Sequence, residues 1–122
     1  PMRLTFLDRL TNTVEFFVHL EDVRRAQPNW QPRTLLDDLE KQLQTSITQG
    51  ARLMARKSPC GLKLQITHGP LVLAKKGEPT VTVTGEVGEL IMFVYGRQDH
   101  SSVELSGPDE LVQAVKSTAF GV

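Results

Sequence analysis

The chain has 122 residues and a mass of 13.6 kDa, the size of a single domain. Apolar residues make up 39% of it, 14 basic residues balance 14 acidic ones, and the pI is near 7.4. A nucleic-acid-binding domain typically has a pI above about 9, so we expect no nucleic-acid partner. No apolar run approaches the ~20 residues of a membrane span, and no signal-peptide pattern opens the chain. We therefore expect a cytoplasmic protein with no membrane partner.

An apolar period of three and four residues predicts a helix over residues 4–26. Its apolar positions are Leu7, Leu10, Val14, Phe17 and Val18. Pro28 ends the helix, because the residue before a proline is disfavoured in the α region. A free N-terminal Pro1 amine can serve as a catalytic base, as in tautomerase-like enzymes, but those enzymes open with a strand. We interpret Pro1 as the start of a truncated chain.

A second helix is predicted over residues 34–57, with Thr34 as its N-cap. Asp37 and Asp38 fall in its first turn, where the helix dipole favours negative charge. The apolar stripe comprises Leu35, Leu36, Leu39, Leu43, Ile47 and Ala51. Residues 58–61 end this helix.

The hydrophobic period changes to two after Gly61. This predicts three strands over residues 62–67, 71–74 and 80–84, joined by short turns as an antiparallel meander. Residues 86–95 fit either a helix or a strand, and acidic residues near their start favour a helix. A strand over 103–105 and a helix that opens at Pro108 complete the chain. The sum is an α+β fold with two long N-terminal helices, an antiparallel sheet and two shorter helices.

Polar residues form a narrow strip along the first predicted helix, in an arc of about 80° at about 100° per residue. The strip comprises Asp8, Asn12, Glu15, His19 and Asp22. Apolar residues flank it, as is typical of a bundle helix with a site in the core. Glu15 and His19 lie one turn apart and can reach one metal ion. The alternative is an ordinary surface pair, since a zinc site needs three or four ligands and His68 and His100 fall in a turn and a loop.

The segment Val-Glu-Phe-Phe-Val-His-Leu-Glu-Asp-Val-Arg-Arg-Ala-Gln-Pro, residues 14–28, resembles the signature of an actinobacterial metal-binding family. This family is related to mycothiol-dependent maleylpyruvate isomerase. Further similar segments are residues 77–86, 88–90, 96–97 and 103–107, so the resemblance spans essentially the whole chain. Members are similar to a DinB-like helical bundle joined to an α+β domain that resembles sterol carrier proteins.

The resemblance implies that residues 1–27 are the last helix of a truncated DinB-like bundle and residues 28–122 a sterol-carrier-like domain. It implies a divalent metal, usually zinc, held by Glu15, His19 and a histidine from an earlier helix that has no counterpart here. It also implies mycothiol as the thiol cofactor. We therefore expect a C-terminal fragment of an isomerase-like or transferase-like protein that is inactive alone.

The family resemblance further implies that an arginine of the C-terminal domain holds substrate carboxylates, and Arg97 matches it best. A guanidinium suits a small carboxylate substrate because it is always charged and binds bidentately. The alternative is a surface arginine at a helix end. Arg24 and Arg25 pose a similar choice between an anionic ligand and pairing with Glu21, Asp22 or the second helix.

The single cysteine, Cys60, excludes an intrachain disulfide framework and a zinc ribbon. Nearby basic residues can lower a thiol pKa, but no partner for catalysis is evident, and we interpret Cys60 as structural.

A competing interpretation of function is a non-catalytic α+β module that binds an apolar ligand or mediates dimerisation. The first helix carries a second apolar side with Phe16, Leu20 and Val23. An exposed apolar patch of this kind marks an interaction site. We therefore expect a homodimer in which first helices pair across a two-fold axis, the commonest symmetry.

Overall fold

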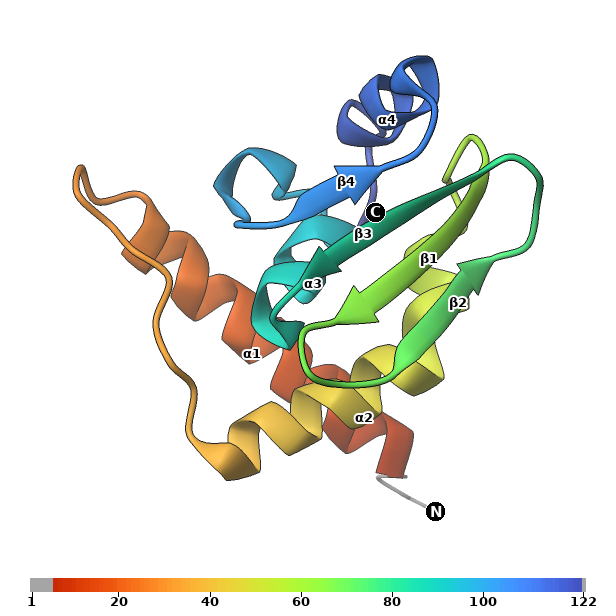
Figure 1. Ribbon diagram of the computed structural model, residues 1–122. Helices are drawn as coiled ribbons and strands as arrows, with labels where there is room; N and C mark the ends of the chain where they lie inside the picture. The colour runs from red at the N-terminus through yellow and green to blue at the C-terminus, as the bar shows by residue number, and fades with distance from the viewer. Residues whose placement is uncertain (1–5, 122) are drawn as a thin grey trace.

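The structure is a computed structural model that describes residues 6–121 and, within the first helix, side chains from Asn12 onward. Its elements are α1 (Phe6–Arg25), α2 (Asp37–Met54), β1 (Gly61–Ile66), β2 (Leu71–Lys75), β3 (Thr80–Gly85), α3 (Val87–Val94), the 3-10 turn η1 (Gln98–His100), β4 (Glu104–Ser106) and α4 (Asp109–Lys116) (Figure 1). The predicted α+β fold and the order of its elements are confirmed. Pro1 and the side chains of Leu7, Asp8 and Leu10 lie outside the described part.

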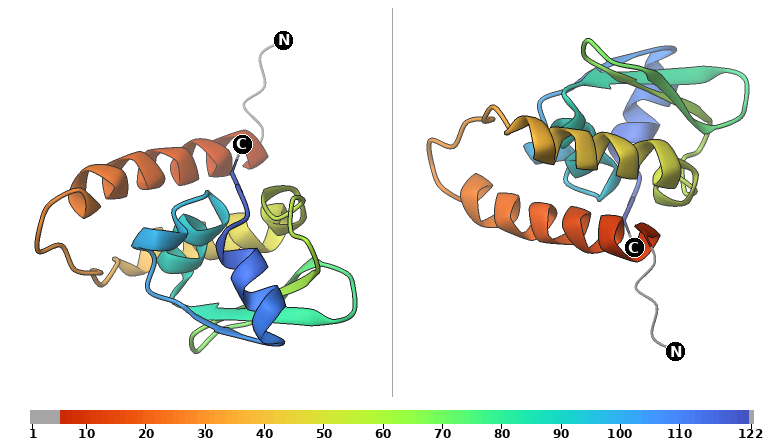
Figure 2. Two further views of the ribbon diagram at one scale, coloured as in Figure 1. Left: turned by 90° about the horizontal axis from the view of Figure 1, so that it is seen from above. Right: turned by 90° about the horizontal axis from the view of Figure 1, so that it is seen from below.

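The elements stack in three layers (Figure 2). The sheet, with strand order β2-β1-β3-β4, forms one outer layer, α2 and α3 lie behind it, and α1 packs on the far side of these helices. All eight residues of α3 are buried, which makes it the centre of the core. The core residues facing α3 from α2 and the strands are Leu43, Ile47, Ala51, Leu62, Leu64, Val81 and Val83. Among the described residues, no helix is long and apolar enough to cross a membrane.

The sheet is mixed, so the prediction of an antiparallel meander is wrong. β1 pairs with β2 antiparallel but with β3 in parallel, in a register that runs from Gly61↔Thr80 to Ile66↔Gly85. The reason lies in residues 76–79, which pass across the start of β1 instead of folding back beside β2. A Cβ on Gly61 would lie only 2.2 Å from the carbonyl oxygen of Gly77. Glycine at position 61 therefore permits the crossing that inserts β1 between β2 and β3.

The N-cap predicted at Thr34 is also wrong. The helix begins at Asp37, and its N-cap, Leu36, makes no side-chain cap hydrogen bond. Leu35 is partly buried against the core before the helix starts, and its Cδ1 lies 3.3 Å from the position a Cβ on Gly88 would take. Burial of this leucine keeps the preceding residues extended and delays the first turn.

α1 presents two different faces. Val14, Phe17 and Val18 are buried against α2 and α3, as the apolar period predicts. On the opposite face, the exposed fractions of Phe16 and Val23 are 72% and 66%. One side of α1 thus joins the core, and the other leaves apolar side chains in solvent.

Candidate functional site

Arg97 and Asp22 connect the end of α3 to α1 across 75 positions of sequence. Nε and Nη2 of Arg97 donate to the two carboxylate oxygens of Asp22 at 3.0 and 2.8 Å, and Nη1 donates to the backbone oxygen of Tyr95. The turn at Gly96, with φ of 84°, aims Arg97 back toward α1. The hydrogen bonds from Arg97 lower the pKa of the Asp22 carboxyl. Each side chain is about one-third exposed, at 33% and 34%, so the pair remains open to solvent.

On α1, Glu15 lies two turns before Asp22 and His19 one turn before it, and both side chains are exposed. Their spacing puts them on the same face of α1 as Asp22, and the charge of His19 contributes to the lowered pKa of Asp22. Burial raises the pKa of Tyr95, and the negative charge of Glu15 raises it further. Glu15, His19, Asp22, Tyr95 and Arg97 form one surface, which we call the junction face. Asp22 thus links Arg97 to the α1 face that carries Glu15 and His19.

The donor types on the junction face suit zinc, but both carboxylate oxygens of Asp22 are bonded by Arg97, which leaves Glu15 and His19 as the candidate ligands. Imidazole nitrogen and carboxylate oxygen are ordinary zinc ligands, and a catalytic site needs three from the protein. Among the described residues, no group of three or more His, Cys, Asp or Glu side chains could hold a metal ion. His68 lies at the turn between β1 and β2 and His100 in η1. Glu15 and His19 therefore provide at most part of a metal site within the described chain.

The strongest electrostatic feature is a buried network that the sequence analysis predicted only in part. Glu21 is fully buried and accepts hydrogen bonds from Arg24, Arg25 and Arg33 at 3.0–3.1 Å. Burial by itself would raise the pKa of Glu21, but the three arginines outweigh it and lower that pKa. The predicted pairing of Arg24 and Arg25 with Glu21 is confirmed, whereas the contribution of Arg33 was missed.

Arg25 extends the network from α1 to α3. Its Nη1 and Nη2 donate to the two carboxylate oxygens of Glu89, each at 2.7 Å. The guanidinium also lies 4.7 Å from the ring centroid of Trp30, close enough for a cation–π contact. The spacing of Glu21 and Arg25 signals a helical ion pair, but nothing local in the sequence distinguishes Glu89 from a solvent-facing glutamate. All side-chain polar atoms buried in the described residues have a partner, so this network is structural.

Cys60 is partly exposed, and its backbone N–H and C=O both bond the Ser58 hydroxyl. Its place in the short segment between α2 and β1 fits the predicted structural role.

Comparison with known proteins identifies no relative for this chain. No family model, curated protein or solved structure matches it.

Proposed function

We propose that this chain carries part of the active site of a metal-dependent protein similar to the mycothiol-dependent maleylpyruvate isomerase family. In this proposal Glu15 and His19 are two ligands of a divalent metal, zinc, and Arg97 holds a carboxylate of the substrate. The remaining ligand comes from outside the described residues. The chain alone is then inactive, and a cytoplasmic location follows from the need to keep a thiol cofactor reduced.

The observation that carries the proposal is the ion pair between Arg97 and Asp22. It fixes a guanidinium from the end of α3 to Asp22, which lies on α1 one turn after His19 and two turns after Glu15. An isomerase acting on a small carboxylate needs a metal and an anion-binding group close together. The sequence separates Arg97 from His19 by more than 70 positions, and the contact between Asp22 and Arg97 supports a shared site.

The metal, when bound, would supply Lewis-acid chemistry by lowering the pKa of a coordinated thiol or water. His19 contributes a neutral imidazole nitrogen, so protonation of this histidine would oppose metal binding. Glu15 contributes a carboxylate that partly neutralises the cation. Both side chains are exposed, so each is accessible to a metal without rearrangement of the core.

Asp22 is a positioning residue for Arg97. The Asp22 carboxylate holds two of the guanidinium nitrogens, Nε and Nη2. A substrate carboxylate must therefore share or displace this interaction, which makes the affinity of Arg97 for an anion dependent on Asp22. Because the pair is one-third exposed, a small anion can approach without unfolding any element.

An alternative proposal is that the chain is a non-catalytic module that dimerises through α1. The exposed side chains of Phe16, Leu20 and Val23 favour it. A contiguous apolar patch of this kind marks a contact site. The two proposals differ in what covers this face of α1: a second copy of the chain in the alternative, and a helix that brings the missing ligand in the leading proposal.

Paramagnetic Mn²⁺ added to the ¹⁵N-labelled protein tests the leading proposal. Binding at Glu15 and His19 should broaden the backbone amide signals of these residues and of Arg97 first, because broadening falls steeply with distance from the ion. Glu15→Ala and His19→Ala should each remove that early broadening.

His68→Ala is the matched control, since it removes another exposed histidine on the opposite layer and should leave the broadening pattern unchanged. If the amide signals around His68, or at the acidic start of α2, broadened before those of Glu15 and His19, the assignment of these two residues as metal ligands would be rejected. Broadening at His19 that spares Arg97 would reject the shared site.

A further inference from the structure

Charge is unevenly distributed along this neutral chain. Residues 41–77 contain seven Lys and Arg residues and no Asp or Glu, so the remainder of the chain carries every carboxylate side chain. This segment comprises most of α2, all of β1 and β2, and the turns between them. The β2 side of the molecule is therefore a basic surface on a protein with no net charge.

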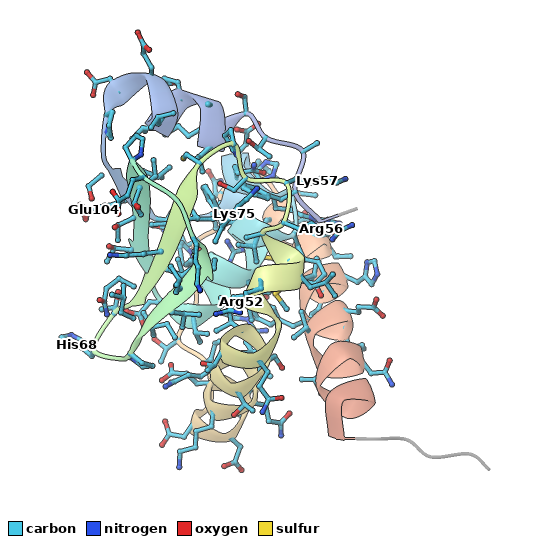
Figure 3. All side chains as sticks on the ribbon, turned by 90° about the vertical axis from the view of Figure 1, so that its right-hand side faces the viewer. Arg52, Arg56, Lys57, His68, Lys75 and Glu104 are labelled. Atoms are coloured by element: carbon cyan, nitrogen blue, oxygen red, sulfur yellow. The ribbon has the colours of Figure 1, made fainter. Side chains whose placement is uncertain are left out.

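Five of the basic side chains gather where α2 and β2 end. They are Arg52, Arg56, Lys57, Lys75 and Lys76, which we call the basic end. The contact that joins them is made by Lys75, whose Nζ donates to the backbone oxygens of Arg56 and Ser58 at 3.1 and 2.7 Å. Figure 3 shows Arg52, Arg56, Lys57 and Lys75 on one side, with His68 at the other end of the hairpin. Five of the seven positive charges of the segment thus lie at one end of β2, and the other two are Lys41 of α2 and Lys63 of β1.

β2 is also an open edge of the sheet. In the described part of the chain it pairs only with β1. Ile66 N–H donates to Pro70 C=O, and bonded and non-bonded pairs alternate along an antiparallel ladder. The register therefore directs the backbone groups of Val72 toward β1 and those of Leu71 and Leu73 away from the sheet. An edge of this kind is a template for one more strand.

The side chains along this edge are apolar and exposed. The exposed fractions of Leu71 and Leu73 are 53% and 39%, and both project from the open face of the sheet while Val72 and Ala74 face the core. Sheet edges left free in native proteins usually carry charges or bulges that prevent pairing. Here lysines occur only where the strand ends, at Lys75 and Lys76, so the middle of the edge remains competent to pair.

A second copy of this chain fits the edge poorly. α2 packs directly behind β2 (Figure 1). Adjacent strands lie about 4.8 Å apart, whereas packed helices need about 8–10 Å between their axes. Pairing β2 with β2 of another copy would bring the two α2 helices too close. An extended segment with no helix behind it avoids this conflict.

We propose that the β2 edge and the basic end together form a docking site for an extended acidic segment of a partner protein. The segment adds as a fifth strand, antiparallel to β2, and bonds the outward backbone groups of Leu71 and Leu73. Its apolar side chains cover these leucines, and the carboxylates at its N-terminal end meet the basic end. Backbone bonds supply affinity, and the charge fixes direction and register.

The test uses a fluorescein-labelled peptide with three acidic residues followed by five alternating valine and threonine residues. Fluorescence anisotropy measures its binding to the full chain. Hydrogen exchange measured by NMR should slow at the amides of Leu71 and Leu73 when the peptide is bound. A peptide with lysines in place of the acids should bind at least about tenfold more weakly because it faces like charge.

The charge-reversal variant Lys57→Glu/Lys76→Glu should weaken binding about tenfold, since both side chains are exposed at the basic end. The matched control is Lys41→Glu/Lys116→Glu, which makes the same net-charge change away from that end and should alter the affinity less than about twofold. If both double variants weakened peptide binding equally, the proposal would be overturned, because the peptide would then respond only to the net charge of the protein. Binding that leaves exchange at Leu71 and Leu73 unchanged would overturn it too. So would binding of the lysine peptide as tightly as the acidic one.

Discussion

Arg25 of α1 and Glu89 of α3 form a bidentate ion pair at the interface of the two helices, with both N–O distances at 2.7 Å. The exposed fractions of their side chains are only 2% and 7%. Because Glu21 also accepts a hydrogen bond from this guanidinium, the arginine joins two buried carboxylates, one from each helix. This contact ties the helix that bears Glu15 and His19 to the domain that bears Arg97.

Replacing Arg25 should lower the free energy of unfolding substantially. Arg25→Met leaves Glu89 buried and without the guanidinium that pairs with it, and removal of one partner from a buried pair costs about 3–5 kcal/mol. Arg24→Met is the control, because Arg24 bonds the same Glu21 but has a side chain 30% exposed, and it should cost about 1 kcal/mol or less. Urea denaturation at pH 7 measures both. Equal losses of unfolding free energy in the two variants would show that the buried Arg25 contributes no more to stability than the more exposed Arg24.

The free energy of unfolding should decrease at acidic pH. The folded-state pKa values of Glu21 and Asp22 lie below their ordinary values, so each contributes stability above the unfolded-state pKa, near 4. This contribution is lost as pH falls through the folded-state pKa. The unfolding free energy should therefore decline below about pH 5. Glu21→Gln should be less stable than the parent at pH 7, with a gap that narrows toward pH 3. A difference in unfolding free energy that stays constant from pH 7 to pH 3 would contradict the lowered pKa of Glu21.

The pKa of Asp22 should depend on Arg97. Arg97→Gln removes the hydrogen bonds that lower it, so the carboxyl should titrate closer to the ordinary value near 3.9. Carbon-13 NMR of the Asp22 side chain measures this directly. Lys116→Gln makes the same charge change on α4 and should leave the titration in place. An unchanged Asp22 pKa in Arg97→Gln would show that the two groups do not interact in solution.

The chain should self-associate through α1. Sedimentation equilibrium at high micromolar concentration should show a dimer. Phe16→Ser/Val23→Ser should shift it to monomer by removing the two most exposed apolar side chains among the α1 residues from Asn12 onward. Leu53→Ser is the control, because Leu53 is 68% exposed but lies on α2. A monomer for the unmodified chain would contradict this prediction.

Local sequence patterns predicted the elements well but not the way they connect. The period of three and four located α1 and the buried positions Val14, Phe17 and Val18, and the change to a period of two located β1. Strand direction depended instead on a close backbone approach at Gly61, which has no periodic signature. The same holds for Thr34, a good cap by residue type, because burial of Leu35 outweighed the local preference.

For the candidate site, sequence alone predicted which residue types lie one turn apart. Glu15 and His19 follow from helical spacing alone. The proximity of Arg97 required knowledge of how the end of α3 packs against α1, and the burial of Glu89 could not be predicted because acidic residues are mostly exposed. Long-range contacts of this kind are set by tertiary packing rather than by neighbours in the chain.

Zinc titration by calorimetry of the unmodified chain and of Glu15→Ala, His19→Ala and His68→Ala tests whether Glu15 and His19 are metal ligands. Two ligands should bind zinc weakly, with a Kd in about the micromolar range or above, because a complete site needs at least three. Loss of either Glu15 or His19 should abolish the heat of binding, and loss of His68 should leave it intact. Since both of the first two positions are exposed, their replacement should change the unfolding free energy by no more than about 0.5 kcal/mol. Zinc binding that survives in Glu15→Ala and His19→Ala, or one zinc held tightly by the monomer, would contradict the account.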